Sequence, residues 1–356
     1  MVKCTSQGKL SYPASLGRTF RQFIRHALLH IMNSATPAAA LIKSPEIAQL
    51  PPALRIIGHV PLGLARAVGS VAGIGAWLFS PGYRRKLNDN LRMAGYGPGP
   101  VRRRAIMEAG RMVAECPYIW AHAPRVIGRQ ALVTDTDVIE AAERRGKGVL
   151  ILTPHLGSFE MAARFYAARR PITVLYKPPK IELLRRWLVA ARAVEGIDAV
   201  PPTVGGLRNM VRTLRRGDIV GLLPDQVPTA GDGHWATFFG QPAYTMTLPA
   251  RLVEMTGCAV VLAVGERLSG GRGWRLRFEP LAEVPTPDVI NRRFEVLIRR
   301  LPHQYLWGYN RYKRPPGVEV DRNAGLLGAA AAASPSLLHD DPVTEAAYPN
   351  ADVPGH

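Results

Sequence analysis

The stretch GVLILTPHLGSFE, residues 148–160, decides how the middle of this chain folds. Its first six residues, GVLILT, form a short apolar run, which predicts a strand buried on both faces. Residues 154–157 then break the strand, and Gly157 permits a tight turn. A helix is predicted from 158 to 169. The chain therefore passes from a buried strand through a turn into a helix, as α/β domains do.

The same alternation continues as far as about residue 315. Further strands are predicted at 172–176, 219–223, 259–264 and 274–279, with helices at 180–194, 205–216 and 288–300. A glycine-rich turn, 269–273, separates the last two strands. Residues 85–125 are predicted to form helices whose apolar faces pack on this unit. The expected fold class is α/β, with a mixed sheet flanked by helices.

The composition of the 356 residues is strongly basic. Lys and Arg number 46 against 27 Asp and Glu, which gives a formal net charge of +19 and favours acidic partners. Nucleic acid is not favoured, because the arginines of helix 205–216 alternate with aliphatic core positions instead of aromatic ones. These arginines are expected to meet an anionic membrane face, an acidic protein or a phosphorylated substrate. The three cysteines, Cys4, Cys116 and Cys258, are too scattered for a disulfide framework or a zinc site and favour a reducing compartment.

An uncharged apolar stretch, residues 67–83, is the best candidate for contact with a membrane. Three glycines dilute it and Pro81 ends it, so residues 55–83 are interpreted as a helix or broken helix lying in the membrane interface. Cations suited to anionic head groups follow at once: Arg84, Arg85, Lys86 and Arg92. The alternative is a core helix with a solvated basic end.

Four regions are expected along the chain. Residues 1–50 are interpreted as a poorly ordered leader and not as a cleaved signal, because His30 interrupts their short apolar run. Residues 51–125 form a helical, membrane-associating region, and 126–320 form the α/β domain. Residues 321–356 lack apolar periodicity and are expected to be a flexible tail.

His155 and Glu160 are the strongest local signal for chemistry, because they follow directly after a buried strand. A strand-to-helix turn can fold the carboxylate back onto the imidazole. A neutral imidazole can then remove a proton from a hydroxyl, while the carboxylate orients the ring and stabilises the imidazolium. The attacking hydroxyl would belong to the substrate. By spacing alone, His155 is better explained as an ordinary loop histidine.

Three ordered motifs resemble one family. They are TPHLGSFEM at 153–161, LPDQVP at 223–228 with ATFFG at 236–240 and PAYTMTLPAR at 242–251, and HQYLWGYNRYKRP at 303–315. Together they are similar to motifs of the glycerolipid acyltransferase superfamily, in the form found in late acyltransferases of lipid A biosynthesis. The resemblance covers about residues 55–317.

The resemblance implies transfer of a fatty acyl chain from acyl carrier protein to a hydroxyl of a lipid A precursor, at the cytoplasmic face of the inner membrane. It makes His155 the general base and Glu160 its orienting partner. The expected partners are acyl carrier protein, the lipid precursor and an anionic membrane surface. No metal or other cofactor is implied, and acyl–acyl carrier protein or acyl-CoA is the co-substrate.

Four further residues are implied to bind substrate. Arg192 falls where the family has an arginine, and its guanidinium could hold a thioester oxyanion or a substrate phosphate. Asp225, at the end of a strand, could hold such an arginine in place. In the C-terminal motif, Arg311 and Lys313 supply charge for a phosphorylated acceptor, although Tyr309–Asn310–Arg311 departs from the usual histidine and paired arginines.

Weaker candidates and alternatives stay open at this point. Lys177 and Lys180 belong to a loosely matched second motif, and Tyr305, Trp307 and Tyr309 could border an acyl groove or lie in the core. The acceptor could be a lysophospholipid, an aminolipid or a glycolipid other than lipid A. The chain could also be a catalytically inactive membrane scaffold of the same fold, although both His155 and Glu160 are present.

Overall fold

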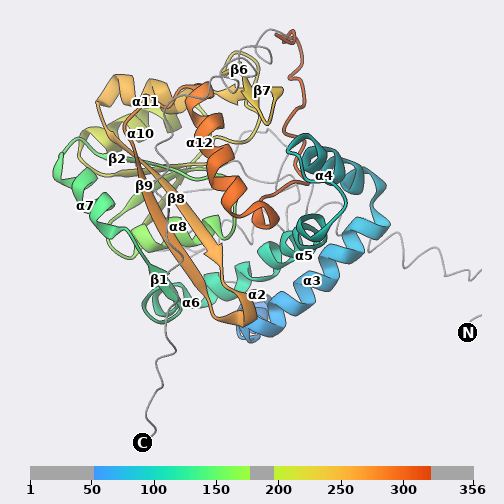
Figure 1. Ribbon diagram of the computed structural model, residues 1–356. Helices are drawn as coiled ribbons and strands as arrows, with labels where there is room; N and C mark the ends of the chain where they lie inside the picture. Colours follow the sequence, from blue (N-terminus) through green and yellow to red (C-terminus); the bar gives the residue numbers. More distant parts are fainter. Residues whose placement is uncertain (1–51, 177–195, 322–356) are drawn as a thin grey trace, which may run out of the picture.

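The computed structural model describes residues 52–176 and 196–321, and its centre is a sheet of seven strands in the order β1-β9-β8-β2-β5-β3-β4 (Figure 1). The strands β8, β2, β5, β3 and β4 are parallel to one another, whereas β9 is antiparallel to β8 and parallel to β1. The sheet is therefore mixed, as predicted. Its strands are β1 Ala131–Val133, β2 Val149–Leu152, β3 Ile172–Leu175, β4 Ile197–Val200, β5 Ile219–Leu222, β8 Ala259–Arg267 and β9 Trp274–Leu281.

Helices flank the sheet, and a separate two-stranded hairpin lies near α12 (Figure 1). The helices are α2 Pro52–Gly58, α3 Leu62–Phe79, α4 Pro81–Met93, α5 Pro100–Ala114, α6 Cys116–Arg129, α7 Thr136–Arg144, α8 Phe159–Ala167, α10 Val204–Arg215, α11 Leu248–Thr256 and α12 Pro287–Arg300. The hairpin consists of β6 Gly233–Phe238 and β7 Gln241–Met246, and the short 3-10 helices are η2 Ser269–Gly271 and η3 Pro302–Gln304. Every strand predicted in the sequence is confirmed. The elements β1, α7, β4, the hairpin and α11 were not predicted from the sequence.

The strands are buried on both faces because helices cover both sides of the sheet. In β2, Val149 and Ile151 belong to the apolar cluster that contains residues of α6, α7 and α8. Leu150 and Leu152 belong to the cluster that contains residues of α4, α5, α10 and α12. Successive side chains of a strand point to opposite faces, so a continuous apolar run fills two cores at once.

The apolar stretch expected between 55 and 83 forms helices that break at two prolines. Pro61 precedes the first residue of α3, and Pro81 is the first residue of α4. Proline suits the first turn of a helix, where its missing N–H has no partner to lose. Helix α3 is long and apolar enough to cross a membrane by length and composition.

Helix α3 turns its small side chains inward and its large apolar side chains outward. A Cβ added at Gly73 would lie 2.3 Å from the carbonyl oxygen of Ile106, and one at Gly110 would lie 1.8 Å from that of Gly69. These glycines therefore let α3 and α5 cross at backbone contact. The outer face carries the exposed residues Leu64, Val68, Val71, Ile74, Leu78 and Phe79.

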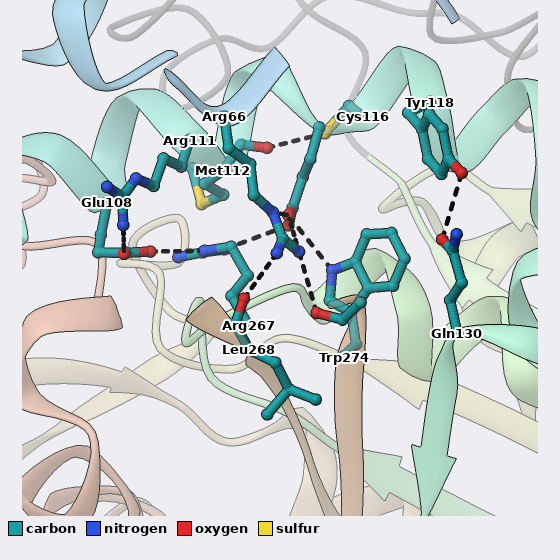
Figure 2. A network of polar contacts seen from close by, with 12 residues as sticks. Arg66, Glu108, Arg111, Met112, Cys116, Tyr118, Gln130, Arg267, Leu268 and Trp274 are labelled. Atoms are coloured by element: carbon teal, nitrogen blue, oxygen red, sulfur yellow. Dashed lines mark hydrogen bonds and ion pairs between the residues drawn. The ribbon is translucent and has the colours of Figure 1, made fainter. Parts of the chain in front are cut away.

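A buried ionic cluster joins α3, α5 and the junction between α5 and α6 to strands β8 and β9 (Figure 2). Arg66 of α3 contacts Glu115 at 2.9 Å and donates to the carbonyl oxygens of Leu268 and Gly273. Arg267 of β8 contacts the same Glu115 at 3.3 Å. We call Arg66, Glu108, Arg111, Glu115 and Arg267 the ionic cluster.

Each carboxylate of the ionic cluster has more than one partner. Glu108 contacts Arg267 at 2.7 Å and Arg111 at 2.6 Å, and the indole of Trp274 donates to Glu115. Burial raises the pKa of Glu108, but the two guanidinium groups outweigh it and the net pKa is lowered. Burial lowers the pKa of Arg267, but the carboxylates of Glu115 and Glu108 outweigh this effect and the net pKa is raised. Glu108 and Arg267 are therefore charged at neutral pH.

Several expectations fall outside the described residues. These are the leader 1–50, the helix 180–194 and the tail from 322 onward. The expected boundary between the helical region and the α/β domain, at 125/126, falls within α6.

Candidate active site

The candidate site lies where two neighbouring parallel strands end. β2 and β5 pair in register, with Leu152 opposite Leu222. His155 follows three positions after Leu152, and Asp225 follows three positions after Leu222. The register therefore brings both residues to the same carboxyl edge of the sheet, where ligand sites of α/β folds gather.

Both oxygens of the Asp225 carboxylate bind His155. The Oδ1 atom lies 2.7 Å from the ring Nδ1, and Oδ2 accepts a hydrogen bond of 2.8 Å from the backbone N–H. Both residues are buried. Because the carboxylate binds the ring and the backbone of the same residue, it fixes the orientation of the imidazole.

Charges nearby keep this carboxylate ionised. Burial raises the pKa of Asp225, but the interaction with His155, its two hydrogen bonds and the positive charge of Arg311 lower it to a net decrease. An ionised carboxylate can only accept hydrogen bonds. The ring must therefore present Nδ1–H to Asp225.

The other ring nitrogen faces Gln226. The amide Nε2 of Gln226 lies 3.2 Å from His155 Nε2, and the ring of Phe159 contacts the imidazole edge-on with centroids 4.9 Å apart. An amide nitrogen donates, so His155 Nε2 accepts. The geometry thus assigns the tautomer with the proton on Nδ1 and a lone pair on Nε2, as a general base requires.

The turn after β2 is held by backbone hydrogen bonds on both sides. Gly157 N–H donates to the carbonyl oxygen of Gln304 at 3.0 Å, and Ser158 N–H donates to that of Gly265 at 2.6 Å. Gly157 has φ +59°, and a Cβ there would lie 2.0 Å from the Gly265 oxygen. Glycine is therefore required both by the left-handed backbone and by the close approach of β8.

Two buried tyrosines complete the surroundings of Asp225. Burial raises the pKa of Tyr305 well above its usual value, and the charge of Asp225 raises it further. Tyr309 accepts a hydrogen bond of 2.8 Å from Val227 N–H, and burial raises its pKa to about 12. Both hydroxyls are therefore neutral at pH 7.

The partner of the imidazole differs from the expected one. From the sequence, Glu160, five positions along the chain, was expected to orient the ring. In the structure, the carboxylate of Asp225 contacts Nδ1. Asp225 was expected to hold an arginine; it holds His155 and lies within the field of Arg311. Glu160 is buried in the first turn of α8, and its role at the site stays a prediction.

Arg311 requires a correction. It was expected at a phosphorylated acceptor, but it is only 2% exposed, and its guanidinium turns into the protein. There it donates hydrogen bonds to the carbonyl oxygen of Tyr244, to Thr245 Oγ1 and to Asn291 Oδ1. Its Cζ atom lies 5.1 Å from the centre of the Phe238 ring. These contacts join the hairpin to α12, because a buried guanidinium requires partners for its donors.

The other expected residues have mixed outcomes. Lys313 is half-buried, with its ammonium 6.0 Å from the centre of the Tyr309 ring, and its contact with substrate stays a prediction. Arg192, Lys177 and Lys180 lie outside the described residues. The three aromatics considered for a groove are buried core residues: Tyr305, Trp307 and Tyr309.

Sequence reasoning missed Gln226 and Gln304. Gln226 stands directly after Asp225 in the quoted motif LPDQVP, so its place at the end of β5 was a usable signal. Gln304 gave no such signal, because its contacts with Gly157 and Arg267 join segments far apart in the chain.

Comparison with known proteins defines the class of this protein, which is an acyltransferase. The chain belongs to the family described as bacterial lipid A biosynthesis acyltransferase, whose model matches residues 52–314. The matched range contains the whole candidate site.

Curated relatives agree with this assignment at modest identity. The lipid A biosynthesis lauroyltransferase of Escherichia coli (strain K12) is 26% identical over 221 residues, 59% of this chain and 71% of the relative. The lipid A biosynthesis palmitoleoyltransferase of the same organism is 26% identical over 216 residues, 58% of this chain and 69% of the relative. A phosphatidylinositol mannoside acyltransferase of Mycobacterium tuberculosis (strain CDC 1551 / Oshkosh) is 26% identical over 199 residues, 54% of this chain and 62% of the relative.

Proposed function

We propose that this acyltransferase moves a fatty acyl chain from a carrier thioester to a hydroxyl of a lipid A precursor, with His155 as the general base. The observation that carries the proposal is the contact between His155 Nδ1 and the ionised Asp225, which leaves a lone pair on Nε2. The family and two of its relatives support the lipid A precursor as acceptor.

The proposed reaction is a direct transfer. Nε2 of His155 takes the proton of the acceptor hydroxyl as its oxygen attacks the thioester carbonyl. The negative charge of Asp225 stabilises the imidazolium that forms. When the tetrahedral intermediate collapses, the carbon–sulfur bond breaks, and the imidazolium returns its proton to the leaving thiolate. The base is thereby regenerated without a covalent enzyme intermediate.

The thioester donor is proposed to be acyl–acyl carrier protein, an acidic partner. A stripe of exposed cations supports this: Arg208, Arg212, Arg215 and Arg216 lie on or directly after α10, whose Met210 and Leu214 are buried. Helix α10 starts where β4 ends, at the carboxyl edge of the sheet, and runs back to the start of β5, so Arg215 and Arg216 lie toward the edge opposite His155. The stripe is thus a basic surface on the domain that carries His155.

We also propose that α3 lies in the interface of the inner membrane, at its cytoplasmic face. Its outer apolar residues suit acyl chains, whereas its inner face is fixed by the glycine crossing with α5 and by the buried Arg66. To span the bilayer, α3 would have to leave α5 and expose the charge of Glu115, which is costly. Co-flotation with anionic vesicles tests this proposal: Val71→Glu is expected to weaken binding, and equal flotation would contradict it.

A different glycolipid is the second candidate for the acceptor. The specific observation is the similarity to a phosphatidylinositol mannoside acyltransferase, whose name gives a mannoside as its acceptor. Both acceptors offer sugar hydroxyls near a membrane surface, so the same base would serve either reaction.

The test is transfer of a labelled acyl chain from acyl–acyl carrier protein by purified protein. We expect acylation of a lipid A precursor by the wild type and a loss of at least about a thousandfold in His155→Ala, since the imidazole acts as both base and acid. A phosphatidylinositol mannoside is tested in parallel as acceptor.

His234→Ala is the matched control, because His234 is an exposed histidine on the hairpin strand β6. It is expected to keep the wild-type rate. Equal rates from the wild type and His155→Ala would refute the base. Transfer only to the mannoside would move the proposal to the second acceptor and leave the base in place.

A further inference from the structure

Gln226 contacts the reactive nitrogen of the proposed base. Its amide Nε2 lies 3.2 Å from His155 Nε2, on the opposite side of the ring from Asp225. Two consecutive residues therefore contact the two ring nitrogens, one with a carboxylate and the other with an amide. Gln226 is half-buried, so its amide can move when substrate enters.

The amide occupies the place that the acceptor hydroxyl needs. A general base must come within hydrogen-bond distance of the proton it removes, so the hydroxyl has to displace the Gln226 N–H from Nε2. Because Gln226 directly follows Asp225, which holds the ring, the displaced amide remains beside Nε2, where the attacked carbonyl must also lie. Its two N–H groups are then available to an oxygen atom that gains negative charge.

The neighbouring donor is already engaged. The next backbone N–H, that of Val227, donates to the hydroxyl of Tyr309 at 2.8 Å. Asp225, Gln226 and Phe159 contact the imidazole with their side chains, and of these three Gln226 carries N–H donors. An ionised carboxylate and a phenyl ring cannot stabilise an oxyanion.

We propose that Gln226 is a further catalytic residue, which donates a hydrogen bond to the carbonyl oxygen of the acyl thioester as the tetrahedral intermediate forms. This inference rests on the proposed function. In the step, the O–H bond of the acceptor breaks and its proton goes to His155 Nε2. The new C–O bond forms, and the carbonyl π electrons move to the oxygen that accepts the Gln226 N–H. On collapse, the C=O bond re-forms and the C–S bond breaks.

Steady-state kinetics of Gln226→Ala and Gln226→Glu test the proposal. Loss of an oxyanion donor lowers kcat by about a hundredfold or more. We expect that loss in both variants with little change in either KM, since glutamate keeps the size of glutamine but offers no N–H when ionised. If Gln226 only covered Nε2 in the resting protein, Gln226→Ala would keep or raise kcat and lower the KM for the acceptor. That outcome would overturn the proposal.

A further measurement separates this proposal from the choice of acceptor. Hydrolysis of the acyl thioester by water uses the same base and the same oxyanion, so it should fall in both variants even if the acceptor is misassigned. Unchanged hydrolysis in both variants would refute the role of Gln226.

Gln241→Ala is the control, because Gln241 is an exposed glutamine at the start of β7. It should leave kcat and hydrolysis unchanged. Loss of activity in His155→Ala with wild-type activity in Gln226→Ala would uphold the proposed function and reject this inference alone.

Discussion

Two buried charged groups, Arg267 in the ionic cluster and Asp225 at the candidate site, differ in what they leave open. In the ionic cluster, Arg267 is charged and enclosed, and its guanidinium contacts both Glu108 and Glu115 (Figure 2). At the candidate site, Asp225 is equally buried, but the ring it holds presents Nε2 to a half-buried amide. The guanidinium of Arg267 binds groups inside the protein. Asp225 instead orients a ring whose second nitrogen, His155 Nε2, contacts a side chain that substrate could displace.

The comparison distinguishes charged groups that stabilise the fold from charged groups that take part in the reaction. Buried ion pairs contribute little net stability over an apolar packing, but breaking one leaves an uncompensated charge. A general base instead requires an orienting charge on one side and a vacant lone pair on the other. Substitutions in the ionic cluster should therefore affect folding, and substitutions at the site should affect rate.

The largest expected effect is that of Asp225→Asn on the rate. The backbone N–H of His155 still requires an acceptor, so the amide oxygen of the asparagine takes that position and its NH₂ faces Nδ1. The ring must then carry its proton on Nε2, where it cannot act as a base. We expect kcat to fall by about 10⁴-fold, as for a triad that loses its carboxylate. Retention of more than a tenth of the wild-type kcat would contradict the tautomer assigned here.

The pH dependence of stability gives the same variant a second readout. The folded pKa of Asp225 is lowered from 3.8, so its contribution to stability is present above that value and is lost as the pH falls through the folded pKa. Asparagine does not titrate. Urea unfolding between pH 6 and 3 should therefore show a smaller loss of stability on acidification in Asp225→Asn than in the wild type.

Much of this fold could be predicted from the sequence because its signals are local. The apolar run that includes Val149–Leu152 and the helical periodicity of Val204–Arg215 each lie within a dozen residues. The elements that were missed have weaker local signals. β1 has three residues, and β4 contains a charged residue, Asp198, because it lies at the edge of the sheet. The hairpin alternates, but it was interpreted only as part of a motif.

The site was predicted in part, for the same reason. His155 was identified because it follows a strand and a glycine turn. The contact of Asp225 with the ring was not predicted because Asp225 lies 70 positions away and reaches His155 only through the pairing of β2 with β5. Arg311 was placed at a substrate because a basic residue in a motif gives no sign of its burial. Register and burial are tertiary properties, which spacing along one chain does not encode.

The next effect in size is that of Arg267→Met on the free energy of unfolding. Methionine fills the volume but leaves the carboxylates of Glu108 and Glu115 with fewer partners in a buried setting. We expect a loss of about 3–5 kcal/mol, measured by urea unfolding at pH 7. The matched control is Arg292→Met, because the Arg292–Glu283 pair is exposed on both sides and contributes less than about 1 kcal/mol. Equal losses in the two variants would show that burial does not distinguish these ion pairs.

The smallest expected effect concerns the glycine crossing that carries α3 and its Arg66. A Cβ at Gly73 would lie 2.3 Å from the backbone oxygen of Ile106, which cannot rotate away, so Gly73→Ala should separate α3 from α5 and cost about 1–3 kcal/mol. Gly63→Ala is the control on the same helix. Nothing lies within 4 Å of its Cβ position, and alanine there should stabilise the helix by up to about 1 kcal/mol. The urea midpoints of the two variants should therefore shift in opposite directions. This tests whether α3 is held by close backbone contact or only by buried apolar area. If apolar area alone held it, the added methyl at Gly73 would stabilise the protein as well.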